Sequence, residues 1–180
     1  MKPFLVLFAL LVQPAVYEFA PAHTTVEFTV DSTLHTVHGT FALKRCTLRI
    51  DPASGRAEGE LVVDAGSGSS ASEGRDRRMT REILEADKYP EFVFHPDRIE
   101  GKLEAQGRSQ VKLHGVIAIH GKQHEITANV DAQAVAGGYD ATARFEVPYI
   151  DWGMKNPSTF ILRVNKVVTV TVHTVVQTAS

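Results

Sequence analysis

Histidine is the residue type in this sequence that most invites a metal-site hypothesis. His35 and His38 lie three positions apart, and His120 and His124 lie four apart. Residues three apart on a strand face opposite sides, and the second pair flanks a predicted hairpin turn, so neither pair converges on one ligand position. The sequence has no His-Glu-x-x-His helix, and its single cysteine, Cys46, cannot supply a cysteine cluster. We therefore expect neither a metal ion nor a cofactor.

The residue types of a serine hydrolase are also present, but no motif brings them together. There is no Gly-x-Ser-x-Gly elbow, and the serines of residues 66–72 lie in a flexible Gly-rich run that makes a poor platform for a nucleophile. Cys46 lies on the apolar side of an alternating segment, as a core residue does. These observations predict no catalytic residue and a protein that is not an enzyme. A hydrolase with an unmarked site remains the enzymatic alternative.

A cluster of arginines forms a third group of side chains that could have a chemical role. Guanidinium groups match phosphate oxygens, so Arg75 and Arg78 are candidates for contacting a phosphate or pyrophosphate head group. Nearby acids offer the alternative of a solvated helix face on which the charges neutralise one another. The arginines are Arg75, Arg77, Arg78 and Arg81, and the acids are Asp76, Glu82 and Glu85.

Strands must position most of these residues, because apolar and polar residues alternate along much of the chain. Turn-forming segments such as His120–Gln123 and Gly137-Gly138 divide the alternating runs into hairpins, and Val164–Val176 closes the chain. The apolar sets expected to share a face are Val26, Phe28 and Val30; Phe41 and Leu43; Cys46, Leu48 and Ile50; Leu61, Val63 and Ala65; Val111, Leu113, Gly115, Ile117 and Ile119; His124, Ile126, Ala128 and Val130; and Tyr139, Ala141, Ala143, Phe145 and Val147.

One segment has helical spacing instead. Ser70 and Glu73 have the spacing of a capping box, which predicts a short α-helix near residues 73–86. Met79, Ile83 and Ala86 would fall on its apolar face, with Leu84 beside them. Tyr89-Pro90 would end it.

About eight strands and one helix predict an all-β fold, an antiparallel barrel whose sheet curls until its edges meet. Eight strands is also the size at which a barrel can hold one small ligand. The 180-residue chain has the size of one domain, which we place at residues 17–180. With 43% hydrophobic residues and a net charge of −2, the composition predicts a globular protein without a nucleic-acid partner.

The N-terminus has the features of a short secretory signal. Met1-Lys2-Pro3 precedes the unbroken apolar run Phe4–Val12. That run is far shorter than the roughly 20 apolar residues of a spanning helix. We therefore expect a signal peptide at residues 1–15, a periplasmic or secreted protein, and no membrane-spanning segment.

Several motifs occur in a characteristic order along the chain. The most specific are the arginine-aspartate start of the helix, Arg75-Asp76-Arg77-Arg78-Met79, and its exit, Lys88-Tyr89-Pro90-Glu91-Phe92-Val93-Phe94. The others are His38-Gly39-Thr40-Phe41, the hairpin Leu113–Lys122, and Tyr149-Ile150-Asp151-Trp152-Gly153-Met154. Together these motifs resemble the YceI-like family of polyisoprenoid-binding proteins, and the resemblance runs from about Tyr17 to the C-terminus. At Arg78 family members often carry a histidine, so a head-group contact made there in relatives is absent or rebuilt here.

The resemblance implies a lipocalin-like barrel that holds an isoprenoid or related amphiphilic lipid in its apolar interior, as a carrier or storage protein. Such a protein could also form a homodimer. The alternative from a different class is a structural or interaction protein with a packed barrel. The residues we expect to line the interior and contact the lipid are Phe28, Phe41, Phe94, Ile117, Phe145 and Trp152.

Overall fold

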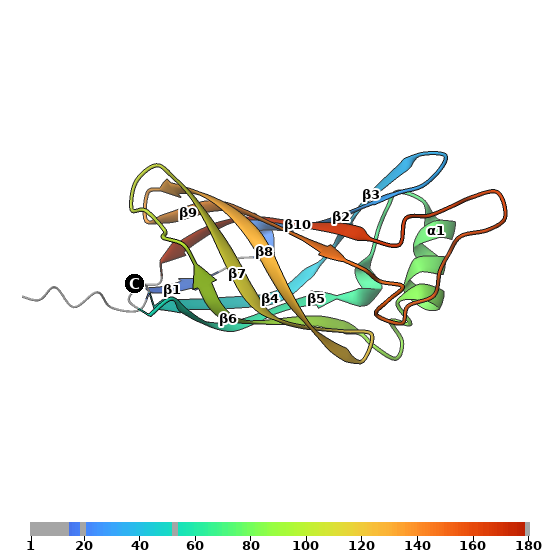
Figure 1. The fold of residues 1–180 in the computed structure, drawn as a ribbon, viewed down its shortest axis with the longest axis horizontal. Helices are drawn as coiled ribbons and strands as arrows, with labels where there is room; N and C mark the ends of the chain where they lie inside the picture. Colours follow the sequence, from blue (N-terminus) through green and yellow to red (C-terminus); the bar gives the residue numbers. More distant parts are fainter. Residues whose placement is uncertain (1–14, 19–20, 52–53, 179–180) are drawn as a thin grey trace, which may run out of the picture.

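The computed structural model describes residues 15–18, 21–51 and 54–178, and they form an elongated barrel with a helix at one end (Figure 1). The predicted signal peptide lies outside the described residues except for Ala15, which begins the first strand. Among the described residues, no helix combines the length and the apolar character that crossing a bilayer demands.

The described elements are strands, apart from four short helical segments. The strands are β1 (Ala15–Glu18), β2 (Thr24–Asp31), β3 (Thr36–Phe41), β4 (Leu43–Asp51), β5 (Arg56–Asp64), β6 (Glu91–Glu100), β7 (Arg108–Ile119), β8 (Lys122–Val135), β9 (Gly138–Val147) and β10 (Val168–Thr178). The helical segments are the 3₁₀ turns η1 (Pro21–His23) and η2 (Ala65–Ser67), the α-helix α1 (Glu73–Arg78) and the π-helix η3 (Met79–Ile83).

The sheet closes on itself, which confirms the predicted all-β antiparallel barrel. Eight strands pair in a ring, in the order β1–β4–β5–β6–β7–β8–β9–β10 and back to β1. Further along the barrel, β2 takes the place of β1 beside β10, and β3 pairs with β2. Ten described strands therefore stand where about eight were predicted, because the turn η1 separates β1 from β2 and Ala42 separates β3 from β4.

Inward and outward residues alternate as the sequence pattern predicts. In β2, Val26 and Phe28 are buried, whereas Thr25 before them and Glu27 between them are exposed. The β7–β8 ladder is regular from Arg108↔Gln133 to Ile119↔Lys122. The turn between these strands is shorter than predicted.

That turn consists of His120 and Gly121 alone, both at positive φ, 49° and 73°. Positive φ at both central positions is the geometry of the tight hairpin turn whose twist matches that of the flanking strands. Tyr89 packs on it: a Cβ added at Gly121 would lie 2.6 Å from the Tyr89 ring. Glycine is therefore required at this position for both backbone and packing reasons.

The predicted helix exists, but it is not a regular α-helix over residues 73–86. After α1 the chain widens into η3, where the Leu84 amide donates to the Met79 carbonyl at 2.9 Å, five residues back. The predicted capping box is wrong, since the N-cap is Ser72 and the Ser70 hydroxyl donates to Asp76. The wider turn brings Met79, Ile83 and Leu84 together onto the barrel interior.

Candidate ligand-binding cavity

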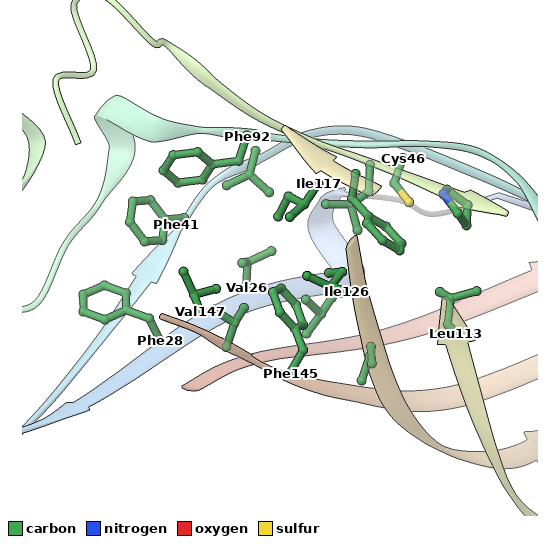
Figure 2. Close-up of a pocket in the computed structure, with 18 of the residues that line it drawn as sticks. Val26, Phe28, Phe41, Cys46, Phe92, Leu113, Ile117, Ile126, Phe145 and Val147 are labelled. Atoms are coloured by element: carbon green, nitrogen blue, oxygen red, sulfur yellow. The ribbon is translucent and has the colours of Figure 1, made fainter. Parts of the chain in front are cut away.

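The barrel encloses a cavity of about 290 Å³ whose exposed wall is entirely apolar (Figure 2). Every described strand contributes to the wall, as do η3 and the segment between β9 and β10. The interior is therefore not the fully packed core that a purely structural barrel would have. This volume lies just below the range of about 300–1,000 Å³ usual for ligand pockets.

Five of the six residues expected in the interior line this cavity. They are Phe28, Phe41, Phe94, Ile117 and Phe145. Figure 2 shows Phe28, Phe41, Ile117 and Phe145 projecting into one common space from different strands. Alternation placed them correctly because each belongs to a strand with one wet face.

Three phenylalanines form a continuous aromatic row in the wall. The Phe28 and Phe41 rings lie 5.3 Å apart, and the Phe41 and Phe92 rings 5.5 Å apart with their planes nearly perpendicular. These are favourable aromatic geometries. Phe92 was not among the predicted interior residues, although its position two residues from Phe94 on β6 places it on the same face.

Two glycines make room for the aromatic row. A Cβ at Gly39 would lie 2.3 Å from the Phe28 ring and 2.5 Å from the Ser69 carbonyl oxygen. A Cβ at Gly68 would lie 2.5 Å from the Met79 methyl group and 2.7 Å from the Phe41 ring. The backbone of β3 and of the segment before α1 therefore approaches the rings more closely than any side chain would allow.

An apolar cluster packs the barrel next to α1. Its buried members are Leu84, Ile119, Val147, Tyr149 and Met154. The Tyr149 hydroxyl donates to the Asn165 carbonyl at 2.9 Å, and burial raises the pKa of this phenol. Tyr149 therefore stays neutral and ties the β9–β10 connection to the cluster.

A second cluster packs the opposite end of the barrel. Its buried members are Tyr17, Ile50, Ala57 and Val176, with Tyr139 packed against them at 6.0 Å from the Tyr17 ring. Burial, followed by the neighbouring Tyr139, raises the pKa of Tyr17. The two clusters bound an uncharged space suited to a hydrocarbon and offering nothing to a charged group.

The cavity holds one potentially reactive side chain, and its environment suppresses that reactivity. Cys46 lies in the wall, and burial raises the pKa of its thiol to about 12. The thiolate, which is the nucleophilic form, is thus negligible at neutral pH. Among the hydrogen bonds of the described residues, none joins a serine or cysteine side chain to a histidine ring, so no hydrolase triad is assembled there.

Comparison with protein families bears on the whole barrel. The description of a YceI-like domain matches residues 17–176, nearly the full described chain. The chain belongs to the YceI-like family. No functionally curated protein matches the sequence.

Solved structures of bacterial YceI-like and related proteins share this fold at low sequence identity. BcnA of Burkholderia cenocepacia is 15% identical, with a TM-score of 0.71, covering 91% of this chain and all of its own. A polyisoprenoid-binding domain of Saccharophagus degradans is 14% identical, with a TM-score of 0.64, covering 93% of this chain and all of its own. The YceI protein of Campylobacter jejuni is 15% identical, with a TM-score of 0.61, covering all of this chain and 92% of its own.

The arginine-aspartate motif, Arg75-Asp76, ties the helix to the segment directly before it. Asp76 accepts hydrogen bonds from the Ser70 amide at 2.9 Å and from the Ser70 hydroxyl. Arg75 donates to the same Ser70, at 2.7 Å to the hydroxyl and 2.6 Å to the carbonyl. Burial by itself raises the pKa of the Asp76 carboxyl, but hydrogen bonds from Ser70 and Ser72 and the Arg75 charge together hold it below its usual value.

Neither of the predicted head-group arginines lines the cavity. Arg75 donates a hydrogen bond to Ser70. Arg78 lies 3.6 Å from Glu82, which follows it by one helical turn. This arrangement matches the alternative of a charge-neutralised helix face better than that of a phosphate site. The link between Ser70 and Asp76 has no sequence signal beyond the family motif, because it depends on how the chain before the helix turns back.

The tyrosine of the family's Tyr-Pro exit fixes the helix end to the β7–β8 turn. The Tyr89 ring lies 4.7 Å from the His120 ring, and His120 Nε2 lies 2.6 Å from a Glu85 carboxylate oxygen. His120 thus has a structural role, through its contacts with Tyr89 and Glu85. Among the described residues, no three His, Cys, Asp or Glu side chains are grouped closely enough to hold a metal ion.

Trp152 lies outside the cavity, unlike the other five predicted residues. Its ring stacks on His124 at 4.0 Å with the planes only 5° apart, beside a shallow depression on the outer face of β8 and β9. Burial and then the Lys122 charge lower the pKa of His124, so its ring is neutral at pH 7. Strand alternation does not apply to Trp152, because this residue lies in the connection between β9 and β10, whereas His124 keeps the alternation of β8 opposite Ile117.

Proposed function

We propose that this protein binds the hydrocarbon chain of an isoprenoid or related amphiphilic lipid inside the barrel, as a periplasmic or secreted carrier or storage protein. The observation that carries the proposal is the apolar cavity of about 290 Å³. The apolar run Phe4–Val12 supports export.

The chemistry of the wall favours a hydrocarbon over a polar ligand. No polar atom is exposed on the wall, so a buried hydroxyl or charge of a ligand would lose its hydration without compensation. Each buried methylene contributes about 0.8 kcal/mol, so a chain of modest length binds without hydrogen bonds. The polar head of the lipid therefore stays outside the apolar section.

A structure of the same fold supports an isoprenoid as the class of ligand. One structure of the same fold is described as a polyisoprenoid-binding domain. At 14% identity the likeness concerns the fold, so the ligand of this chain has to be established directly.

The test is lipid extraction from protein purified from its host, followed by uptake of a fluorescent isoprenoid alcohol delivered from detergent. We expect a co-purifying amphiphile and saturable uptake at one site. Absence of both would overturn the proposal.

Substitution of wall residues locates the site. Ile117→Asp and Phe145→Asp place a carboxylate in the apolar space and should abolish uptake. Thr127→Asp on the exposed face of β8 is the matched control and should leave uptake unchanged. Circular dichroism checks that each variant is folded, and normal uptake by folded Ile117→Asp would show that the ligand binds elsewhere.

A further inference from the structure

Large apolar side chains are exposed at the α1 end of the barrel. Phe160 is 95% exposed, Ile161 80% and Leu34 69%. We call these three residues the apolar tip. Isolated exposed apolar residues are ordinary, but a group of them on one projection marks an interaction site.

The loop that carries two of them is held in a defined turn. The Thr159 amide donates to the Leu162 carbonyl at 2.8 Å, and the Leu162 amide donates to the Thr159 hydroxyl at 3.1 Å. Phe160 and Ile161 occupy the middle of this turn. Both therefore point outward because the backbone is pinned on either side.

The β2–β3 hairpin lies against the same loop. The Thr33 amide donates to the Arg163 carbonyl at 2.9 Å, and the Arg163 amide donates to the Thr33 hydroxyl at 3.3 Å. Leu34, next to Thr33, therefore belongs to the same projection as Phe160 and Ile161. Figure 1 shows the hairpin and the loop after β9 extending together from the barrel end that carries α1.

The segment that carries Phe160 and Ile161 is basic. Residues 155–166 contain three basic residues, Lys155, Arg163 and Lys166, and no acidic one. Lys155 lies 3.3 Å from Glu82. Arg163 and Lys166 make no ion pair with any other described residue, so their charges are free to meet an anionic partner.

The loop also forms part of the cavity wall. Pro157 and Val164, on either side of the turn, line the cavity while Phe160 and Ile161 between them face outward. The exposed apolar surface is thus separated from the apolar interior by a single segment of chain.

We propose that the apolar tip docks onto an anionic lipid membrane, with Phe160 and Ile161 entering the boundary between head groups and acyl chains. Apolar side chains beside free cations match the chemistry of that boundary. The choice of a membrane over a protein partner rests on the proposed function, since a bilayer is the phase from which a lipid chain is taken.

The test is flotation of the full chain with vesicles of phosphatidylglycerol mixed with phosphatidylcholine, and with vesicles of phosphatidylcholine alone. We expect binding to the anionic vesicles that weakens as salt is added. Phe160→Ser combined with Ile161→Ser should reduce the partition coefficient at least about tenfold, because both side chains leave the bilayer boundary. Arg163→Gln and Lys166→Gln should each reduce it about fivefold, as expected for one cation near an anionic surface.

The matched control changes exposed apolar residues at the opposite end of the barrel. Val135 and Val175 are 42% and 39% exposed, and Val135→Ser with Val175→Ser should leave vesicle binding unchanged. Isoprenoid uptake from detergent, which needs no membrane, should be normal in the apolar-tip variants.

The proposal is overturned if the wild-type protein does not float with anionic vesicles, or if the Phe160→Ser, Ile161→Ser variant floats equally well. It is also overturned if the apolar tip instead joins two copies, seen as a dimer that the variant converts to a monomer without any vesicle binding. Uptake from detergent without vesicle binding would remove the membrane proposal and leave the proposed function standing. Vesicle binding without lipid uptake would remove the proposed function and leave vesicle docking by the apolar tip standing.

Discussion

Replacing Ala143 with phenylalanine tests the cavity by filling it. Ala143 lies in the wall on β9, so the added ring projects into the space that the proposed lipid chain occupies. The substitution is apolar throughout, and it adds neither charge nor an unpaired polar group. Loss of binding would therefore come from lost volume rather than from a damaged core.

The cavity volume sets the expected magnitude. A volume of about 290 Å³ holds roughly ten methylene-sized groups, if each takes the ~30 Å³ of a water molecule. The phenyl ring occupies about six of these positions, and at ~0.8 kcal/mol each the ligand loses about 5 kcal/mol. With 1.4 kcal/mol per factor of ten, Kd should rise by about three to four thousandfold.

The same ring should stabilise the ligand-free protein. Burying a phenylalanine side chain contributes about 1.5–3 kcal/mol, partly offset by repacking, so the free energy of unfolding should rise by about 1 kcal/mol. Uptake titrations with a fluorescent isoprenoid give Kd, and urea denaturation gives the stability. Thr142→Phe, on the same strand but outside the cavity wall, should change Kd little. A folded Ala143→Phe protein with wild-type Kd would refute the assignment of the cavity as the lipid site.

Other predictions concern packing, pH and reactivity. Gly39→Ala should lower the free energy of unfolding by about 2 kcal/mol through overpacking against the Phe28 ring. Gly74→Ala, where a Cβ meets nothing within 4 Å, should raise the free energy of unfolding by about 0.5–1 kcal/mol. Equal denaturation midpoints of the Gly39→Ala and Gly74→Ala variants would contradict the close packing at Gly39. Because the folded-state pKa of Asp76 is below its ordinary value of 3.8, its contribution to stability is complete above that pH and is lost on acidification through the folded-state pKa. Denaturation across this pH range should show that acidification lowers the free energy of unfolding less in Asp76→Asn than in the wild type. An equal decrease in both proteins would refute the role given to the carboxyl. The Cys46 thiol should react slowly with iodoacetamide in the native state and quickly in urea, whereas fast native labelling would mean that it is accessible.

Much of the fold follows from local patterns. The period-two alternation identifies the inward faces of β2, β7, β8 and β9, because a strand with one wet face and one apolar face permits only one orientation. The same reasoning places Phe28, Ile117 and Phe145 in the interior, where the structure has them. It does not locate Trp152, which lies in the connection between β9 and β10 and stacks on the His124 ring.

The helix shows a second limit of local reasoning. Ser70 and Glu73 have the spacing of a capping box, yet Ser70 bonds Asp76 and Arg75 instead. The π-helical turn brings Met79, Ile83 and Leu84 onto one surface, an arrangement favoured by the apolar interior that they cover. Spacing alone cannot anticipate it, because a regular α-helix satisfies the same hydrogen-bonding groups.

The sequence by itself determined the barrel, the faces of its strands and its membership of the YceI-like family, because these depend on residue periodicity and on ordered motifs. Only the tertiary structure decided that the interior holds a cavity rather than a packed core, since that volume depends on how ten strands and the helix close around each other. It also showed that Arg75 donates to Ser70, and that Thr33 of the β2–β3 hairpin bonds Arg163 of the loop that carries Phe160. Contacts between residues far apart in the chain arise from the closure of the barrel, which no local pattern records.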